Sequence, residues 1–345
     1  MIIAIGGATL LVAVLLLLLG ANPLEAFRLL FAGSFGSIPK VSATLLVWVP
    51  LVIASASLVI TYSTGLWNIG VEGQIIMGAI FATGAARMVP GPGWVVILAG
   101  VVAGITGGVL WGLLAGVLRT HGGVNEIFGG LGLYFVALGM TTYLVIGPWA
   151  REGVASTSGT DLFAREAWFP RLSYNGAPLD ISWLSLLLAI ASIGGVYFLM
   201  RGTMFGLKLK AIGNSMASSA RLGIPSNRYM LGAFAVAGGL AGLAGTTQAM
   251  AFHHKLVPSV SGGFGFLGIL VVLLAGFRAA PVAPLALFFA ALSVGASQLE
   301  LRLDLDSSVG GVIQGTLVLF VLLAAGWQRR RGELRAAAID AEGGG

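Results

Sequence analysis

Three polar side chains lie close together in a short segment between two long apolar stretches. Asn68, Glu72 and Gln74 fall within TGLWNIGVEGQIIMGA, residues 64–79, where they could hydrogen-bond a small polar solute. They could instead serve a helix terminus, with Asn68 as the cap and Glu72 in the first turn, near the positive end of the dipole. The glycines of this segment would permit a broken backbone, which a membrane tolerates only under cover of protein or a wet cavity. The segment is therefore either a capping loop or a discontinuous element that lines a pathway.

Two further segments interrupt apolar stretches in a comparable way. In GGVNEI, Asn125 and Glu126 open an apolar stretch, either as a cap followed by an acid that matches the helix dipole or as polar groups at a gate. In VSGGFGFLGILVVLL, residues 260–274, glycines precede an apolar run that carries Phe264 and Phe266. We expect a half-helix here. It would be the counterpart of residues 64–79 in an inverted repeat of the kind that transporters use.

The longest polar segment with charge of only one sign runs from residue 201 to residue 228. It contains Arg201, Lys208, Lys210, Arg221 and Arg228 and no acidic residue. Its glycines and alanines suggest short helices joined by tight turns. The segment could simply follow the positive-inside rule. Alternatively, it could press a pair of short helices into a cytoplasmic partner, with basic residues steering the encounter.

The sequence lacks the residues that ATP hydrolysis, a zinc site or ion-coupled transport would require. The sequence lacks the G-x-x-x-x-G-K-[ST] phosphate-binding loop, so we expect no ATP hydrolysis by this chain. It contains no cysteine, and its three histidines, His121, His253 and His254, are expected in loops, where a zinc site is not favoured. Acidic residues fall at the ends of apolar stretches, whereas ion-coupled carriers place them at mid-depth. The energy for transport is therefore expected to come from another chain.

The composition requires a membrane protein. The 345 residues are 57% hydrophobic and only 9% charged, whereas soluble domains carry about 25% charged residues. In a bilayer, the 53 glycines indicate close approach of helices through small side chains. We predict an all-α polytopic protein with about ten spans, formed by residues 2–20, 42–62, 70–88, 94–118, 127–147, 182–200, 229–250, 263–277, 282–299 and 309–327.

The distribution of charge predicts the orientation of these spans. With both termini in the cytoplasm, the whole formal charge of +6 falls on the cytoplasmic side, as the positive-inside rule expects, so the basic excess needs no nucleic acid to explain it. We expect spans 2–5 and 7–10 to form an inverted repeat. Residues 1–327 would be the transmembrane domain, 148–181 the large outer loop, and 328–345 a disordered cytoplasmic tail. The outer loop is either a solvated connection or a docking surface for a soluble partner.

These motifs together resemble one family. The core GLWNIGVEGQ, then Asn125-Glu126-Ile127, the stretch KAIGN at 210–214, Gly223-Ile224 and AGLAG at 241–245 are similar to the permease subunits of bacterial ABC importers for branched-chain amino acids, ribose and nucleosides. The resemblance covers about residues 40–325 and is closest to the nucleoside-type branch. Gly129, Gly130 and Tyr134 occupy a region where that branch usually carries Thr and Asn, so a different solute is possible.

The resemblance implies a transport subunit that is not itself an enzyme. It would work with a second permease copy or a paralogue, a cytoplasmic ABC ATPase that holds ATP and Mg²⁺, and an extracytoplasmic solute-binding protein, in a prokaryotic plasma membrane. The solute would be a nucleoside, or alternatively a simple sugar or branched-chain amino acid. An ion-coupled secondary transporter or channel is the rival hypothesis. The resemblance assigns ATPase coupling to Gly206, Lys208, Lys210, Ala211, Ile212, Gly213, Asn214, Arg221, Gly223 and Ile224. The expected pathway or gate residues are Asn68, Glu72, Gln74, Asn125, Glu126, Tyr134, Phe264 and Phe266.

Overall fold

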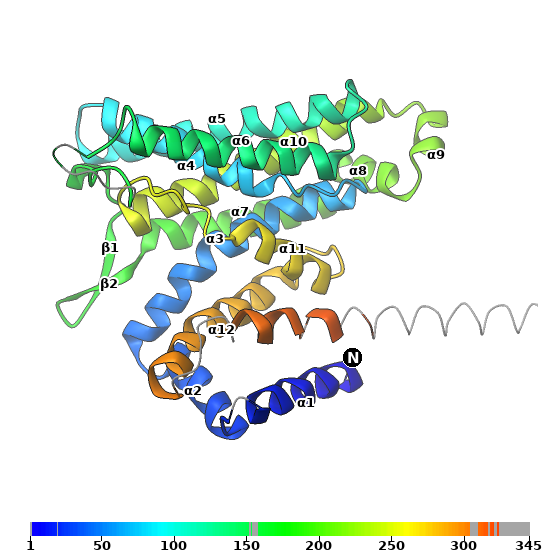
Figure 1. Ribbon diagram of the computed structural model, residues 1–345. Coiled ribbons are helices and arrows are strands. Elements are labelled where there is room, and N and C mark those ends of the chain that lie inside the picture. The colour runs from blue at the N-terminus through cyan, green and yellow to red at the C-terminus, as the bar shows by residue number, and fades with distance from the viewer. Residues whose placement is uncertain are drawn as a thin grey trace, which may run out of the picture. The chain divides into compact units, whose positions relative to one another are not determined.

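The computed structural model describes residues 2–18, 20–151, 153, 158–303, 310–316, 318–320 and 323, and most of them are helical (Figure 1). The predicted tail, residues 328–345, lies outside the described residues. The elements in chain order are α1 (Ile2–Leu18), α2 (Pro23–Phe35), α3 (Ile38–Ser63), α4 (Val71–Met88), α5 (Gly93–Thr120), α6 (Glu126–Ile146), the 3₁₀-helix η1 (Arg165–Ala167), β1 (Arg171–Tyr174), β2 (Ala177–Ser182), α7 (Trp183–Gly202), α8 (Met204–Asn214), α9 (Met216–Arg221), α10 (Ser226–Thr247), the π-helix η2 (Gln248–His253), α11 (Phe264–Leu274) and α12 (Val282–Leu303).

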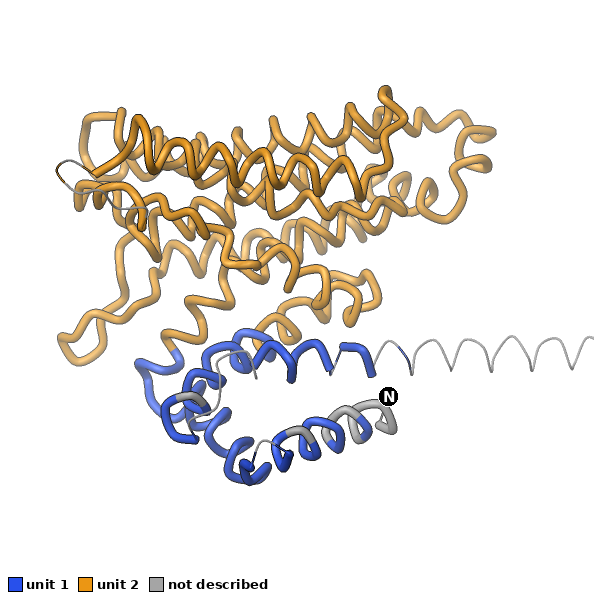
Figure 2. The backbone as a smooth tube through the Cα atoms, in the orientation of Figure 1, with its two compact units in different colours: residues 1–41, 288–345 blue, residues 42–287 orange. Residues whose placement is uncertain are grey.

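The helices divide into two compact units (Figure 2). The first comprises residues 1–41 and 288–345, and the second comprises residues 42–287. In the first unit α1 and α2 form a bent pair, with 106° between residues 10–18 and 23–35. Asn22 caps α2 by accepting a hydrogen bond from the Leu24 N–H at 3.0 Å. A Cβ on Gly33 would lie 3.1 Å from the Cα of Gly295, so α2 packs closely on α12 within this unit.

Glycine sets the packing of the second unit, where α4, α5 and α10 lie against one another (Figure 1). A Cβ on Gly78 of α4 would come within 2.2 Å of the Cα of Gly242 on α10. A Cβ on Gly108 of α5 would lie 2.1 Å from the carbonyl oxygen of Gly238. No side chain fits at such distances, so the backbones themselves are in contact. The prediction that glycine allows close helix approach is confirmed.

The helices are those of a membrane protein. Among the described residues, six are long and apolar enough to cross a bilayer, and the bent pair α1–α2 would make a seventh. The six are α3, α5, α6, α7, α10 with η2, and α12, which match six of the predicted spans. The elements at three other predicted spans do not qualify on their own: α4 is not among the six, and α11 and the helix at 310–320 are too short. The prediction of ten spans is therefore not confirmed by helix length and composition.

The segment predicted as a large outer loop, residues 148–181, contains regular structure. It includes η1, β1 and most of β2, and the two strands pair antiparallel as a hairpin. Asn175 and Gly176 form the turn with φ of 50° and 79°. Two successive residues with positive φ are what the tightest hairpin turn requires, and Asn-Gly is its preferred sequence. The expectation of an all-α fold is wrong in this segment.

Candidate functional site

The segment that joins α3 to α4, residues 64–70, is irregular with a turn at each end, and it is mostly buried. Its successive side chains alternate between buried and exposed positions: Leu66 and Asn68 are buried, and Trp67 between them is exposed. The Asn68 side-chain amide donates to Gln74 Oε1 at 3.1 Å, and the Gln74 amide donates to Asn68 Oδ1 at 3.1 Å. Both side chains are at most 1% exposed, so this reciprocal pair offers no free group to a solute in this conformation.

The pairing of Asn68 corrects one expectation from the sequence. Asn68 does not cap α4: the N-cap residue is Gly70, and no side chain hydrogen-bonds there. The amide group of Asn68 finds its partner within the helix instead of at the helix end. The residue therefore ties this segment to the first turn of α4, which fixes where that helix begins.

Glu72 accepts hydrogen bonds from the N-terminus of a helix other than its own. It lies in the first turn of α4, as expected, but its Oε1 atom accepts hydrogen bonds from the backbone N–H groups of Gly265 at 3.1 Å and Phe266 at 3.3 Å. These N–H groups belong to the first turn of α11, which has no side-chain cap of its own. A carboxylate at this position satisfies otherwise unpaired donors and faces the positive end of the α11 dipole. The two broken elements predicted from the sequence, residues 64–79 and 260–274, are thus in direct contact.

Two aromatic residues meet beside this contact. The rings of Tyr134 on α6 and Phe266 on α11 lie 5.7 Å apart in an edge-to-face arrangement. A Cβ on Gly73 would come within 3.1 Å of the Tyr134 Cα, which places α6 directly against α4 near Glu72. The structure therefore brings together Glu72, Tyr134 and Phe266. Phe264 is half-buried, and its ring packs near Gly262 in the turn that precedes α11.

Asn125 and Glu126 make a separate arrangement at the start of α6. Asn125 caps the helix by accepting a hydrogen bond from the Ile127 N–H at 2.9 Å, which is one of the two roles that the sequence left open. Glu126 forms an ion pair with Arg119 at the end of α5, with 3.0 Å between Nε and Oε2. These contacts join α5 to α6 and leave Glu126 engaged with a structural partner.

The basic stretch folds into the two short helices that its composition suggested, α8 and α9. The side chains of Leu209 and Ile212 are buried, and Ile212 packs with Leu66 and Phe234. Lys208 donates to the Tyr229 hydroxyl at 2.9 Å, and Lys210 donates to a backbone carbonyl oxygen at 2.6 Å. Of the predicted coupling residues, Lys210, Gly213, Asn214, Arg221 and Gly223 are exposed, Lys208, Ala211 and Ile224 are half-buried, and Gly206 and Ile212 are buried.

The outward side of α8 and α9 is apolar as well as basic. Met204, Leu207 and Met216 are exposed, and Leu222 is 78% exposed just after α9. Large apolar side chains that protrude beside Arg221 form a surface suited to a partner protein, because water solvates them poorly. We call Met204, Leu207, Met216, Arg221 and Leu222 the α8–α9 surface.

A cluster around His254 was missed from the sequence. The ring of His254, the residue after η2, stacks on Trp168 with centroids 3.9 Å apart and planes within 4°. Its Nδ1 lies 2.9 Å from the Met250 carbonyl oxygen and its Nε2 lies 2.9 Å from an Arg171 guanidinium nitrogen. A carbonyl can only accept and a guanidinium can only donate, so the ring is neutral with its proton on Nδ1. Burial lowers the pKa of His254. Among the described residues no group of His, Asp or Glu side chains could hold a metal ion.

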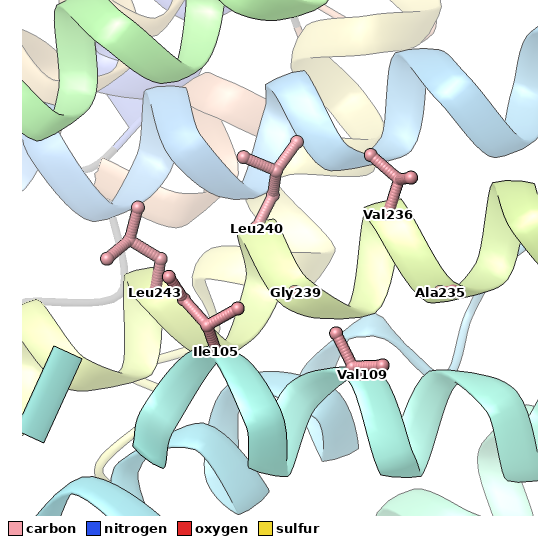
Figure 3. Close-up of a pocket in the computed structure, with 7 residues that line it drawn as sticks. All are labelled: Ile105, Val109, Ala235, Val236, Gly239, Leu240 and Leu243. Carbon is pink, nitrogen blue, oxygen red and sulfur yellow. The ribbon is translucent and has the colours of Figure 1, made fainter. Parts of the chain in front are cut away.

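An apolar pocket of about 330 Å³ lies between α5 and α10 (Figure 3). It is lined by Ile105, Val109, Ala235, Val236, Gly239, Leu240 and Leu243. A nucleoside or sugar placed here would lose its hydrogen bonds with water without replacement, which is costly for every polar group. The pocket is therefore not a site for a polar solute.

Comparison with known proteins agrees with these features. The family profile described as the permease component of branched-chain amino acid transport systems matches residues 41–322. The nucleoside ABC transporter permease NupB of Lactococcus lactis is 30% identical, over 86% of this chain and 82% of its own length. The glucose ABC transporter permease TsgB13 of Haloferax volcanii is 28% identical, over 95% and 86%, and the guanosine permease NupP of Bacillus subtilis is 26% identical, over 90% and 88%.

Proposed function

The chain belongs to the permease family of branched-chain amino acid transport systems, and from that premise we propose that it carries nucleosides through the membrane. It is a permease subunit of an ABC transporter and not an ATPase itself. Two of the relatives above are nucleoside or guanosine permeases, which supports a nucleoside as the solute. The glucose permease among the relatives keeps a simple sugar as the alternative, with a branched-chain amino acid as a further one.

The observation that carries the choice of solute is the aromatic pair beside the Glu72 contact. Phe266 is 40% exposed and its ring lies against Tyr134, so an aromatic face is available where α6 and α11 meet. Nucleobases bind proteins by stacking on such faces, and stacking is worth about 1–3 kcal/mol per base. We propose that Tyr134, Phe264 and Phe266 line the pathway or its gate. The polar residues expected at the pathway would instead position the helices that line it, through their contacts within the protein: Asn68, Glu72, Gln74, Asn125 and Glu126.

We infer the ten-span arrangement, with both termini in the cytoplasm and an inverted repeat of spans 2–5 and 7–10, as the topology. Contacts between loops that it places on the same side support it. On the inner side a Cβ on Gly213 would lie 3.2 Å from the Gly65 nitrogen. On the outer side the Thr160 N–H donates to the Leu256 carbonyl at 2.9 Å. The contact between residues 64–79 and 260–274 is what an inverted repeat with two broken elements would produce.

Two exposed surfaces, the α8–α9 surface and residues 148–181, suggest where partner proteins would dock. We propose that a cytoplasmic ABC ATPase, which carries ATP and Mg²⁺, docks on the α8–α9 surface through its exposed apolar and basic side chains. A second permease copy or a paralogue would complete the pore. A solute-binding protein would dock on residues 148–181, where the hairpin exposes Tyr174. The site of action would be a prokaryotic plasma membrane.

Uptake measurements test the solute and the energy source together. Cells that express the chain with the ABC ATPase and binding protein of its own source should take up radiolabelled guanosine, and unlabelled uridine should compete better than glucose or leucine. Better competition by glucose would overturn the nucleoside proposal. Uptake that survives a hydrolysis-deficient ATPase but collapses with the ion gradient would establish the secondary transporter instead, a mechanism to which the buried Glu72 carboxyl could contribute.

Substitution on the α8–α9 surface tests the docking proposal. Leu222→Glu should strongly reduce co-purification of the ATPase, because it places a charge in an apolar contact. Tyr174→Glu is the matched control, since Tyr174 is also an exposed large side chain but lies at the hairpin. Equal recovery of the ATPase with both variants would place the docking surface elsewhere.

A further inference from the structure

We propose that residues 64–70 form a mechanical link between the ATPase-docking helix α8 and the N-terminus of α11, with Gly213 at one end and Glu72 at the other. We call residues 64–70 the linker segment. The proposal rests on the proposed function, because it presumes that an ATPase moves α8. It adds a route by which that movement reaches the aromatic pair, and it assigns Gly213 and Glu72 as positioning residues.

The first contact of the route is between two backbones. A Cβ on Gly213 would lie 2.2 Å from the carbonyl oxygen of Ser63, the last residue of α3, and 3.2 Å from the Gly65 nitrogen. Gly65 has a φ of +75°, a conformation that favours glycine, so the chain turns sharply at this point of contact. Because no side chain separates α8 from the turn, a displacement of α8 cannot be absorbed by a rotamer change.

The body of the linker segment is held at both sides. Leu66 packs with Ile212 of α8 in one buried cluster, so a movement of α8 would move the Leu66 side chain with it. Two residues on, Asn68 is tied to Gln74 of α4 by the reciprocal amide pair. Both contacts are buried, and close-packed protein interiors have low compressibility, so they transmit a displacement to their neighbours. Movement at Gly213 therefore reaches the first turns of α4.

The far end of the route is Glu72. Its Oε1 atom accepts hydrogen bonds from the Gly265 and Phe266 N–H groups, so the N-terminus of α11 is anchored to α4. A Cβ on Gly265 would lie within 3.1 Å of the Glu72 backbone nitrogen, which shows that the two backbones also touch. Phe266 carries one of the two aromatic rings at the proposed gate. A shift of Glu72 thus repositions a gate side chain that is 53 residues beyond Gly213 in the chain.

The test uses the complete transporter in proteoliposomes. Gly213→Ala forces α8 away from Ser63, and Gly202→Ala at the end of α7 is the control, because nothing lies within 4 Å of a Cβ there. We expect Gly213→Ala to lower ATP-driven uptake by about tenfold or more while the ATPase still co-purifies and hydrolyses ATP. Gly202→Ala should transport normally. Unimpaired uptake with Gly213→Ala would overturn the link.

A labelling reporter follows α11 directly. This chain contains no cysteine, so Ser259→Cys, at an exposed position just before α11, gives the chain a single thiol whose alkylation can be followed on its own band. Its alkylation rate should change when ATP analogues bind, and Gly213→Ala should abolish that change. A nucleotide response that persists with Gly213→Ala contradicts the route, as does the lack of any response in the reporter alone. Complete lack of ATP-driven uptake by the unsubstituted transporter would instead refute the proposed function.

A second pair of variants tests the Glu72 end. Glu72→Gln keeps an oxygen that can accept from the α11 N–H groups, whereas Glu72→Ala removes it. We expect Glu72→Ala to abolish both the nucleotide response and uptake, and Glu72→Gln to restore most of the nucleotide response. If both variants lose the response equally, the carboxylate charge and not the hydrogen-bonded anchor is what matters, and the mechanical role of Glu72 is refuted.

Discussion

Substitution of Gly242 by alanine should destabilise the second unit relative to an alanine placed where the helix surface has room for it. Gly242 lies on α10 where this helix crosses α5, and its Cβ would come within 2.2 Å of the Gly104 carbonyl oxygen and 2.9 Å of the Gly108 Cα. Ordinary contacts begin near 3.4 Å. The two helices must therefore separate by about 1 Å, which loosens their whole line of contact.

The magnitude follows from two opposing effects. Alanine in place of glycine inside a helix is favourable by about 1 kcal/mol. Overpacking of a tight interior costs about 1–3 kcal/mol, occasionally more. Gly194→Ala on α7 isolates the first effect, because nothing lies within 4 Å of a Cβ at that position. The free energies of unfolding of the two variants should thus differ by about 1–3 kcal/mol, with Gly242→Ala the less stable.

Thermal unfolding in detergent, followed by size-exclusion chromatography of the heated samples, measures this difference. We expect the Tm of Gly242→Ala to fall below that of Gly194→Ala by several degrees, since 1 kcal/mol corresponds to about 2–4 °C in a domain of this size. A Gly242→Ala variant as stable as Gly194→Ala would refute the reasoning, because it would mean that α5 and α10 do not approach as closely as described.

Three further outcomes are expected. Asn68→Ala should cost about 1–3 kcal/mol by leaving the buried Gln74 amide without a partner, and in a double-mutant cycle with Gln74→Leu the two effects should be strongly non-additive; simple additivity would contradict the pairing. Stability should fall as the pH drops below the ordinary histidine pKa of about 6.5, because burial lowers the pKa of His254 and the unfolded chain then binds the extra proton. His254→Gln should reduce this dependence of Tm between pH 7.5 and 5.5, and an unchanged slope would exclude His254 as a source of it. Arg171→Met should also weaken the dependence, since it removes the donor that requires a neutral ring, and a steeper dependence would contradict that role.

Local features of the structure were predictable because they depend on neighbouring residues. The hydropathy of long windows predicted ten spans, and six of them are helices long and apolar enough to cross a membrane. Small and basic residues indicated short helices between residues 201 and 228, and the Asn125 cap follows from its place before an apolar run. The hairpin at residues 171–182 was also within reach, because Asn175-Gly176 between alternating residues is its usual signal. The prediction of a loop over residues 148–181 does not account for this signal.

Sequence by itself determined that this chain is an apolar, glycine-rich membrane protein of the ABC permease type, and it marked the segments around Glu72, Phe266 and Gly213 as unusual. Only the tertiary structure decided how these segments meet. Glu72 holds backbone groups that lie 193 and 194 residues away in the chain, and Gly213 touches the turn at Gly65. No local pattern encodes such contacts, because a carboxylate can satisfy the terminus of any helix and a glycine can admit any backbone. Which terminus and which backbone are chosen depends on how the whole set of helices packs.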